Sequence, residues 1–135
     1  MKAISLWQPW ASLIPLGFKH YETRIWPTKY RGKLLICSTV HKAQHYREFL
    51  KIKDVLKLPD WSEANFPHGR AIAVCDLTDC TEMTAEFIGQ QTPTEILCGH
   101  WLIGSFAWKL ENVQAIAVPF PVKGRQKLFD VDFAA

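Results

Sequence analysis

The sequence predicts an α+β fold in which a small mixed β-barrel carries helices at its periphery. Three observations support this prediction. First, the 135 residues are 48% hydrophobic and 13% aromatic, which provides a core for one domain and excludes an intrinsically disordered chain. Second, strand-like segments outnumber helical ones. Third, most connections between strands are too short for the helical crossovers of a parallel α/β sheet. We therefore expect a single domain over residues 1–135.

The N-terminal segment is expected to form a strand and a short helix. Ala3–Leu6 is short and apolar, which suits a strand. Pro9 suits the first turn of a helix, because its fixed φ is compatible with the helix and its missing N–H is not needed there. The helix is expected to run to about Leu16 and to end at Gly17.

The next two segments predict a β-hairpin. His20–Trp26 has the β-branched and aromatic content of a strand, and Leu34–Thr39 is an apolar strand. Tyr30–Lys33 lies between them and contains a glycine that suits a turn. We therefore expect the two strands to lie side by side.

The rest of the chain is expected to add two helices and four strands. Apolar residues recur at helical spacing over Ala43–Leu58, with Lys and Arg between them, which predicts a surface helix. Thr81–Gln91 is expected to form a shorter helix. The remaining strands are expected at Arg70–Thr78, Phe106–Leu110, Ala115–Val118 and Leu128–Phe133.

The N-terminus resembles a signal peptide only superficially. Residues 3–18 carry no charge, but Gln8, Pro9 and Pro15 interrupt the run and no small-residue cleavage site follows. Another apolar stretch, Ala115–Val122, is well short of the roughly 18 residues of a membrane span. We therefore expect a cytoplasmic protein with no membrane partner.

The charge distribution points to a polyanionic partner. Residues 1–58 contain eleven Lys and Arg against three Asp and Glu, whereas residues 59–135 contain five against ten. A basic half of this kind is typical of proteins that bind nucleic acid. The lysines of the expected surface helix account for part of the excess without any functional reason.

The cysteines predict buried thiols and no metal site. The four cysteines form no C-x-x-C pair, and Cys37, Cys75 and Cys98 lie in apolar runs. Their spacing to the histidines matches no common zinc finger or ribbon.

Aromatic and basic residues interleave near the N-terminus. Planar rings stack on unpaired bases and contribute roughly 1–3 kcal/mol each, while cations bind phosphates. This composition predicts a nucleic-acid surface, although Trp7 and Trp10 taken alone suit a hydrophobic core equally well. A second basic turn near the C-terminus is a further candidate for phosphate contact. The candidate binding residues are Trp7, Gln8, Trp10, Trp26, Lys29, Tyr30, Arg31, Lys123 and Arg125.

Glu22 and Arg24 are expected to be neighbours. In an extended strand, side chains two residues apart lie on one face, so the carboxylate and the guanidinium meet. Lys19 has the opposite parity and joins them only if the strand begins after it and the turn at Gly17 directs its side chain across. A structural ion pair and a reactive site are equally compatible with this pattern.

Several motifs together resemble the ASCH (ASC-1 homology) domain family. The N-terminal ones are Ser5–Leu13, Gly17-x-Lys19-x-x-Glu22-x-Arg24 and Tyr30–Leu34, and the C-terminal ones are Phe106–Asn112 and Pro121–Phe129. They occur in the family's order and cover essentially the whole chain. The resemblance implies a PUA-like β-barrel with flanking helices, a cleft lined by Lys19, Glu22 and Arg24, and binding of RNA or another nucleic acid.

The resemblance also implies two enzymatic alternatives. Some members of the family are metal-dependent ribonucleases; here Glu22 would serve as the base, and Lys19 and Arg24 would stabilise the transition state. A divergent branch deacetylates N4-acetylcytidine with a Lys, a Thr and a Glu, but this chain has Glu22 at the position of that Thr, which argues against the activity.

We therefore expect an RNA-binding domain that takes a single-stranded segment or an extruded nucleotide. Lys19, Glu22 and Arg24 form the expected site and would be the catalytic residues of a ribonuclease. A DNA-binding module is the remaining alternative. No cofactor is expected, except a divalent cation if the protein cleaves RNA.

Overall fold

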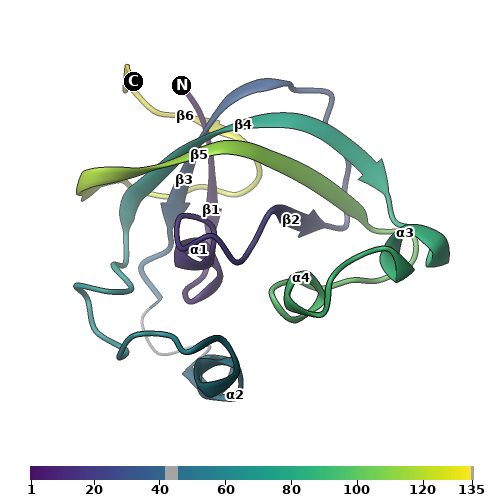
Figure 1. Cartoon of the computed structure of the whole chain (residues 1–135). Coiled ribbons are helices and arrows are strands. Elements are labelled where there is room, and N and C mark those ends of the chain that lie inside the picture. Colours follow the sequence, from purple (N-terminus) through teal and green to yellow (C-terminus); the bar gives the residue numbers. More distant parts are fainter. Residues whose placement is uncertain (42–45, 135) are drawn as a thin grey trace.

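A computed structural model describes residues 1–41 and 46–134 (Figure 1). Within these ranges the chain forms a mixed sheet of six strands and four short helices. No helix in this part of the chain is long and apolar enough to cross a membrane. In chain order the elements are β1 (Lys2–Leu6), α1 (Trp10–Leu13), β2 (Tyr21–Arg24), β3 (Gly32–Ser38), α2 (Tyr46–Leu56), β4 (Arg70–Glu82), α3 (Ala85–Gly89), α4 (Pro93–Leu97), β5 (Phe106–Pro121) and β6 (Phe129–Asp130).

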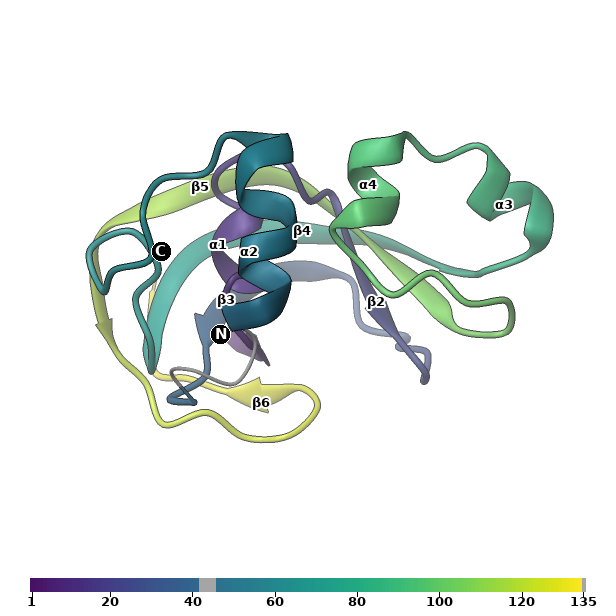
Figure 2. The same ribbon diagram turned by 90° about the horizontal axis from the view of Figure 1, so that it is seen from below.

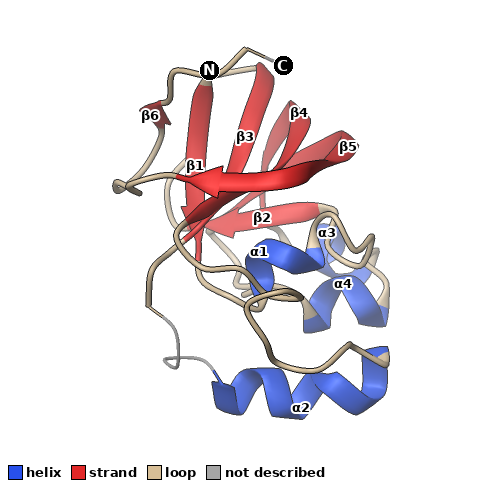
Figure 3. Ribbon diagram, turned by 90° about the vertical axis from the view of Figure 1, so that its left-hand side faces the viewer, coloured by secondary structure: helices blue, strands red, loops and turns tan. Residues whose placement is uncertain are grey.

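The strands follow the order β2-β5-β4-β3-β1-β6 across the sheet. β1 and β3 are parallel, and the other neighbouring pairs are antiparallel. The long neighbouring strands β5 and β4 are the second and third from the β2 end of the sheet, and they curve strongly (Figure 1). The helices gather on one side, as Figure 3 shows, with α1 against the sheet and α2 farther out. Figure 2 places α3 and α4 beside the end of the sheet that carries β2.

The α+β class is confirmed, but the closed barrel is not. The sheet order has β2 at one end and β6 at the other, and no ladder joins these two strands within the described residues. The expected C-terminal strand Leu128–Phe133 shrinks to the two residues of β6, which pair with Lys2 and Ala3 of β1. A two-residue strand is too short to complete a barrel.

Two apolar clusters hold the layers together. The first lies between the sheet and α1 and is centred on the fully buried Trp108, with Ile36 and Ile14 among its members. The second joins α2 to α1 through Phe49 and Leu13, both of which are buried. Each large apolar side chain that is fully buried contributes about 1.5–3 kcal/mol to folding. Burial rather than helix propensity therefore holds these short helices in place.

The prediction of a β-hairpin in the N-terminal half is wrong. β2 pairs with β5, in the register Glu22↔Trp108, so β5 and β4 separate it from β3. β2 also ends at Arg24 rather than at Trp26, because Trp26 turns in to pack edge-on against Trp108 with ring centroids 4.8 Å apart. The segment after Trp26 then crosses to β3, which begins two residues earlier than expected, at Gly32.

Further elements differ from the expectation, beginning with α1, which ends at Leu13 rather than at about Leu16. β4 continues through Glu82, so the helix expected from residue 81 begins only at Ala85, where the Thr84 side chain caps it by accepting from the Phe87 N–H. The two strands expected at residues 106–110 and 115–118 are one strand, β5, which passes through Asn112 at a φ of 52°. α4 was not expected. The described part of α2 begins at Tyr46, so the expected start at residue 43 lies outside the described residues.

The cysteines offer a test of this packing. Burial raises the pKa of Cys37 and of Cys75 to about 12 and that of Cys98 to about 11, whereas Cys80 is half-buried. Thiolates rather than thiols react with disulfide reagents. At pH 8 we therefore expect the folded protein to release one equivalent of thionitrobenzoate quickly, from Cys80, and the other three only on unfolding. Fast release of two or more equivalents would contradict the packing.

Candidate functional site

A cleft of about 520 Å³ lies between the sheet and the helices. Its size is within the range of small-molecule sites. One wall comes from the end of β1 and from α1, and the floor comes from β2 with the turn before it. The opposite wall comes from α2 and the loop after α4. The lining residues with polar or aromatic side chains are Ser5, Trp7, Trp10, Lys19, Glu22, Thr23, Arg24, Glu48, Lys51 and His100.

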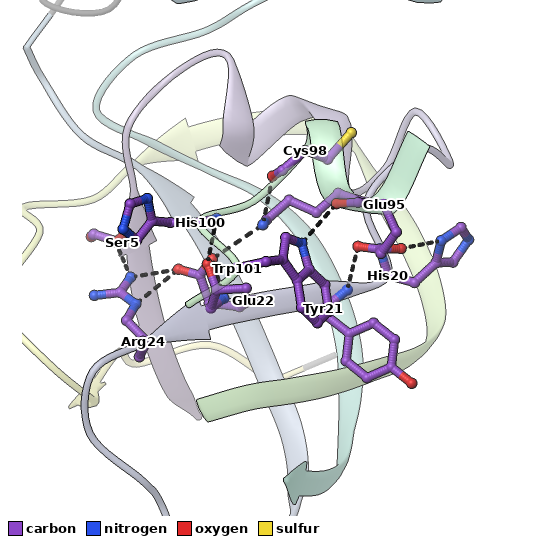
Figure 4. A network of polar contacts seen from close by, with 11 residues as sticks. Ser5, His20, Tyr21, Glu22, Arg24, Glu95, Cys98, His100 and Trp101 are labelled. Carbon is purple, nitrogen blue, oxygen red and sulfur yellow. Dashed lines mark hydrogen bonds and ion pairs between the residues drawn. The ribbon is translucent and has the colours of Figure 1, made fainter. Parts of the chain in front are cut away.

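The floor of the cleft is a buried row of three charges, drawn in Figure 4. Lys19 Nζ lies 3.4 Å from Glu22 Oε1, and Arg24 donates to Glu22 Oε2 from Nε at 2.8 Å. The side chains of Lys19 and Glu22 are only 1% and 8% exposed, whereas that of Arg24 is 23% exposed. The predicted juxtaposition is therefore confirmed. Lys19 lies behind Glu22, and Arg24 is the member of the row that faces the open cleft.

Arg24 is held from two sides and keeps one nitrogen for a ligand. Its Nη2 donates to the Ser5 carbonyl at 2.9 Å and lies 2.8 Å from Glu22 Oε2. Its Nη1 has no protein partner within the described residues. A guanidinium carries five N–H donors and no acceptor. The two N–H groups of Nη1 therefore have no acceptor within the described residues, and Arg24 lines the cleft.

The turn before β2 explains how Lys19 reaches the row. The Leu13 carbonyl accepts from the N–H groups of both Phe18 and Lys19, and Gly17 adopts a φ of 90° that residues with a Cβ rarely adopt. β2 then begins only at Tyr21. The condition expected from the sequence is therefore met. Lys19 precedes the strand, and its Nζ donates to the Cys98 carbonyl at 2.9 Å.

A buried carboxylate from α4 anchors the same segment. Glu95 is 4% exposed and accepts from the backbone N–H groups of His20 and Tyr21, at 3.0 to 3.2 Å (Figure 4). It also lies 3.0 Å from His20 Nδ1, and its own carbonyl accepts from Trp101 Nε1. Glu95 thereby ties α4 to the start of β2. It sets the position of the residues on either side, including Lys19 and Glu22.

Of the binding residues expected near the N-terminus, Trp7 and Trp10 form an aromatic wall of the cleft, whereas Gln8 does not line it. Trp7 is 36% exposed and Trp10 is half-buried, and both line the cleft. Gln8 is 2% exposed, and its amide is used within the protein: Nε2 donates to Ser12 Oγ and to the Pro67 carbonyl, and Oε1 accepts from the Ser12 N–H. Gln8 therefore fixes the start of α1 and the position of the two tryptophans.

The other expected binding residues lie outside the lining of the cleft. Trp26 packs on Trp108, with Lys127 Nζ 5.7 Å from its ring centre. Lys29 is exposed on the segment between β2 and β3. In the same segment the Tyr30 hydroxyl donates to the Lys33 carbonyl, and Arg31 donates to the carbonyls of Thr28 and Tyr30.

The basic turn between β5 and β6 lies close to one edge of the cleft. Lys123 and Arg125 border a second, shallower hollow beside β6. Gly124 between them approaches β1 so closely that a Cβ there would lie 2.6 Å from Ser5 Oγ. Because the Ser5 carbonyl also holds Arg24, the turn and the charged row share one residue of β1.

The sequence signature of the ASCH domain matches residues 4–120. The chain belongs to the ASCH domain family. It is also similar to the activating signal cointegrator 1 of Mus musculus and to that of Homo sapiens, with 32% identity over 137 and 132 residues respectively. Each alignment covers 96% of this chain and 22% of the relative. The chain thus spans about a fifth of the length of the curated relatives it matches.

Several residues that line the cleft of this ASCH domain are not among those expected from the sequence. Lys51 and Glu48 of α2 reach the cleft, although the lysines of this helix were interpreted as solvated. His100 lines the far side, and its N–H donates to Thr23 Oγ1 at 3.0 Å. The sequence around Glu95 does contain a recognisable motif. Thr92 followed three residues later by a glutamate is a capping box that predicts the start of α4, although here the carboxylate reaches β2 instead.

Proposed function

We propose that this ASCH domain binds single-stranded RNA and takes one unpaired nucleotide into the cleft. The observation that carries the proposal is the combination of an aromatic wall with a fixed cation: Trp7 and Trp10 stand beside Arg24, whose Nη1 has no partner within the described residues. Rings bind the flat faces of bases, and a guanidinium binds phosphate oxygens or base edges. A cleft of about 520 Å³ accommodates a base and its sugar.

The surroundings of the cleft favour a polyanion. Lys51 stands on the α2 wall, and the turn with Lys123 and Arg125 adjoins Ser5 on the other side. A strand whose extruded base occupies the cleft would pass these cations with its phosphates. Lys29 and Arg31 are exposed on the segment between β2 and β3 and offer further phosphate contacts.

The hydrogen bonds of Glu22 favour binding over cleavage. Its Oε1 accepts from the Thr23 N–H and forms an ion pair with Lys19, and its Oε2 accepts from Arg24. A general base needs a lone pair within reach of the proton that it removes. Here the 2′-hydroxyl of RNA would have to displace an internal donor. Deacetylation of a modified cytidine is disfavoured as well, because Glu22 stands at the position where the deacetylating branch has its Thr.

The proposal is tested by removing one ring of the aromatic wall, that of Trp7. Because base–aromatic stacking is worth about 1–3 kcal/mol, Trp7→Ala should weaken the binding of a fluorescein-labelled twelve-nucleotide RNA by roughly 5- to 100-fold in anisotropy titrations. Tyr46→Ala is the matched control, because Tyr46 is 41% exposed and lies outside the cleft lining. Equal affinities for Trp7→Ala and the unmodified protein would refute the proposed site. Tighter binding of the DNA of the same sequence would favour the DNA-binding alternative.

A further inference from the structure

Three hydrogen-bond acceptors at the floor of the cleft, the Glu22 carboxylate and the carbonyls of Ser5 and Cys98, already hold donors of the protein. Glu22 accepts from the Thr23 N–H and from Arg24 Nε and forms an ion pair with Lys19. The Ser5 carbonyl accepts from Arg24 Nη2, and the Cys98 carbonyl accepts from Lys19 Nζ. A ligand group that donates a hydrogen bond at this floor would therefore have to share an acceptor with the donors that hold the charged row together.

The donors at the same floor are available. Arg24 Nη1 carries two N–H groups with no protein acceptor within the described residues. Thr23 Oγ1 accepts from the His100 N–H, so its own hydroxyl proton can be donated to a ligand. Glu48 and Lys51 line another side of the cleft and are not part of this floor. The groups at the floor therefore favour ligands that present hydrogen-bond acceptors.

Bases differ in the group that they present at one position of the ring. Guanine and uracil carry a carbonyl oxygen at position 6 or 4, which is an acceptor, whereas adenine and cytosine carry an amino group there, which is a donor. An amino group that faces the Arg24 N–H groups would place two donors against each other. A donor that is buried without an acceptor costs free energy. A base that presents an amino group to Arg24 should therefore bind more weakly than a base that presents a carbonyl oxygen.

We infer that the cleft selects keto bases, uracil and guanine, over amino bases, with Arg24 Nη1 reading the carbonyl oxygen. This inference rests on the proposed function, since it concerns the base that enters the same cleft. Glu22 and Lys19 act here as positioning residues. In this proposal they hold the Arg24 guanidinium in an orientation in which Nη1 can donate to the ligand.

The test compares three eight-nucleotide RNAs made of uridine, of cytidine, or of the pyrimidin-2-one riboside that carries hydrogen at position 4. We expect the uridine RNA to bind about tenfold more tightly than the cytidine RNA, with the pyrimidin-2-one RNA between them, because it loses the acceptor without gaining a donor. Equal affinities of the three, or a preference for cytidine, would overturn the inference while leaving RNA binding intact. Absence of binding to all three would overturn the proposed function as well.

A variant locates the preference at Arg24. Arg24→Lys keeps a positive charge beside Glu22 but removes Nη1, so the preference for uridine should fall below about twofold while the uridine RNA still binds. Arg70→Lys is the matched control, because Arg70 is exposed at the start of β4, and it should keep the full preference. A tenfold preference that survives in folded Arg24→Lys would refute Arg24 as the reading residue. The wild-type series decides the inference if that variant does not fold.

Discussion

Replacing Glu22 by Ala is expected to lower the free energy of unfolding by about 3–5 kcal/mol. Lys19 is 1% exposed, and without Glu22 its buried ammonium keeps only the Cys98 carbonyl as a partner within the described residues. Removing one partner of a buried ion pair leaves the other charge uncompensated, which is what makes the change severe. The measurement is urea unfolding at pH 7, with the midpoint and the slope fitted separately.

The control for this prediction is an exposed pair. Lys109 and Glu111 lie 3.5 Å apart with 45% and 46% of their side chains exposed, so Glu111→Ala should cost at most about 1 kcal/mol. The double variant Lys19→Met, Glu22→Leu should be more stable than Glu22→Ala, because it leaves no unpaired charge at Lys19. Equal losses of unfolding free energy for Glu22→Ala and Glu111→Ala would show that the charged row contributes no more to stability than an exposed ion pair does.

Glu95→Ala is expected to destabilise the fold by about 2–4 kcal/mol and to weaken RNA binding at the same time. The change removes the acceptor of two backbone N–H groups, those of His20 and Tyr21, and an unsatisfied buried donor costs about 1–3 kcal/mol. It also frees the start of β2, which positions Lys19 and Glu22. Thermal unfolding and anisotropy titration with the same labelled RNA measure the two effects.

Glu95→Gln separates the two effects of this prediction. The amide keeps one oxygen acceptor, so we expect a smaller loss of stability and an RNA affinity closer to that of the unmodified protein. Glu86→Ala is the control, since Glu86 is an exposed acidic residue of the neighbouring helix α3. An unchanged RNA affinity in Glu95→Ala that is folded at the temperature of the titration would contradict the positioning role of Glu95.

Local patterns predicted the part of the site that lies within one strand. The period-two geometry of an extended chain was enough to bring Glu22 and Arg24 together, and Gly17 indicated the turn that delivers Lys19. The remaining contacts of the row come from far along the chain. Cys98 is 79 residues from Lys19, and Glu95 is 75 residues from His20. No spacing rule relates residues so far apart, because their proximity is a product of the whole fold.

The errors in the predicted fold have the same origin, because local patterns do not determine which distant segments meet. Turn residues between two strands predict that the chain reverses, but they do not determine which strand lies next to which. β2 therefore paired with β5 although its sequence neighbour is β3. In β5 a single left-handed residue, Asn112, was compatible with a break between two strands, yet its side chain donates to Asp76 of β4 and the ladder continues past it. Tertiary pairing overrode the local signal.

The shortness of β2 leaves much of β5 without a neighbour on one side. β2 covers only Phe106–Lys109, whereas β5 continues to Pro121 and pairs there with β4 alone. The uncovered backbone is an apolar stretch in which Val118 is 80% exposed, a combination that favours intermolecular strand addition and aggregation. Pro119 and Pro121 lack the N–H that an incoming strand needs, so these two prolines act as gatekeepers that protect the protein from assembling edge to edge.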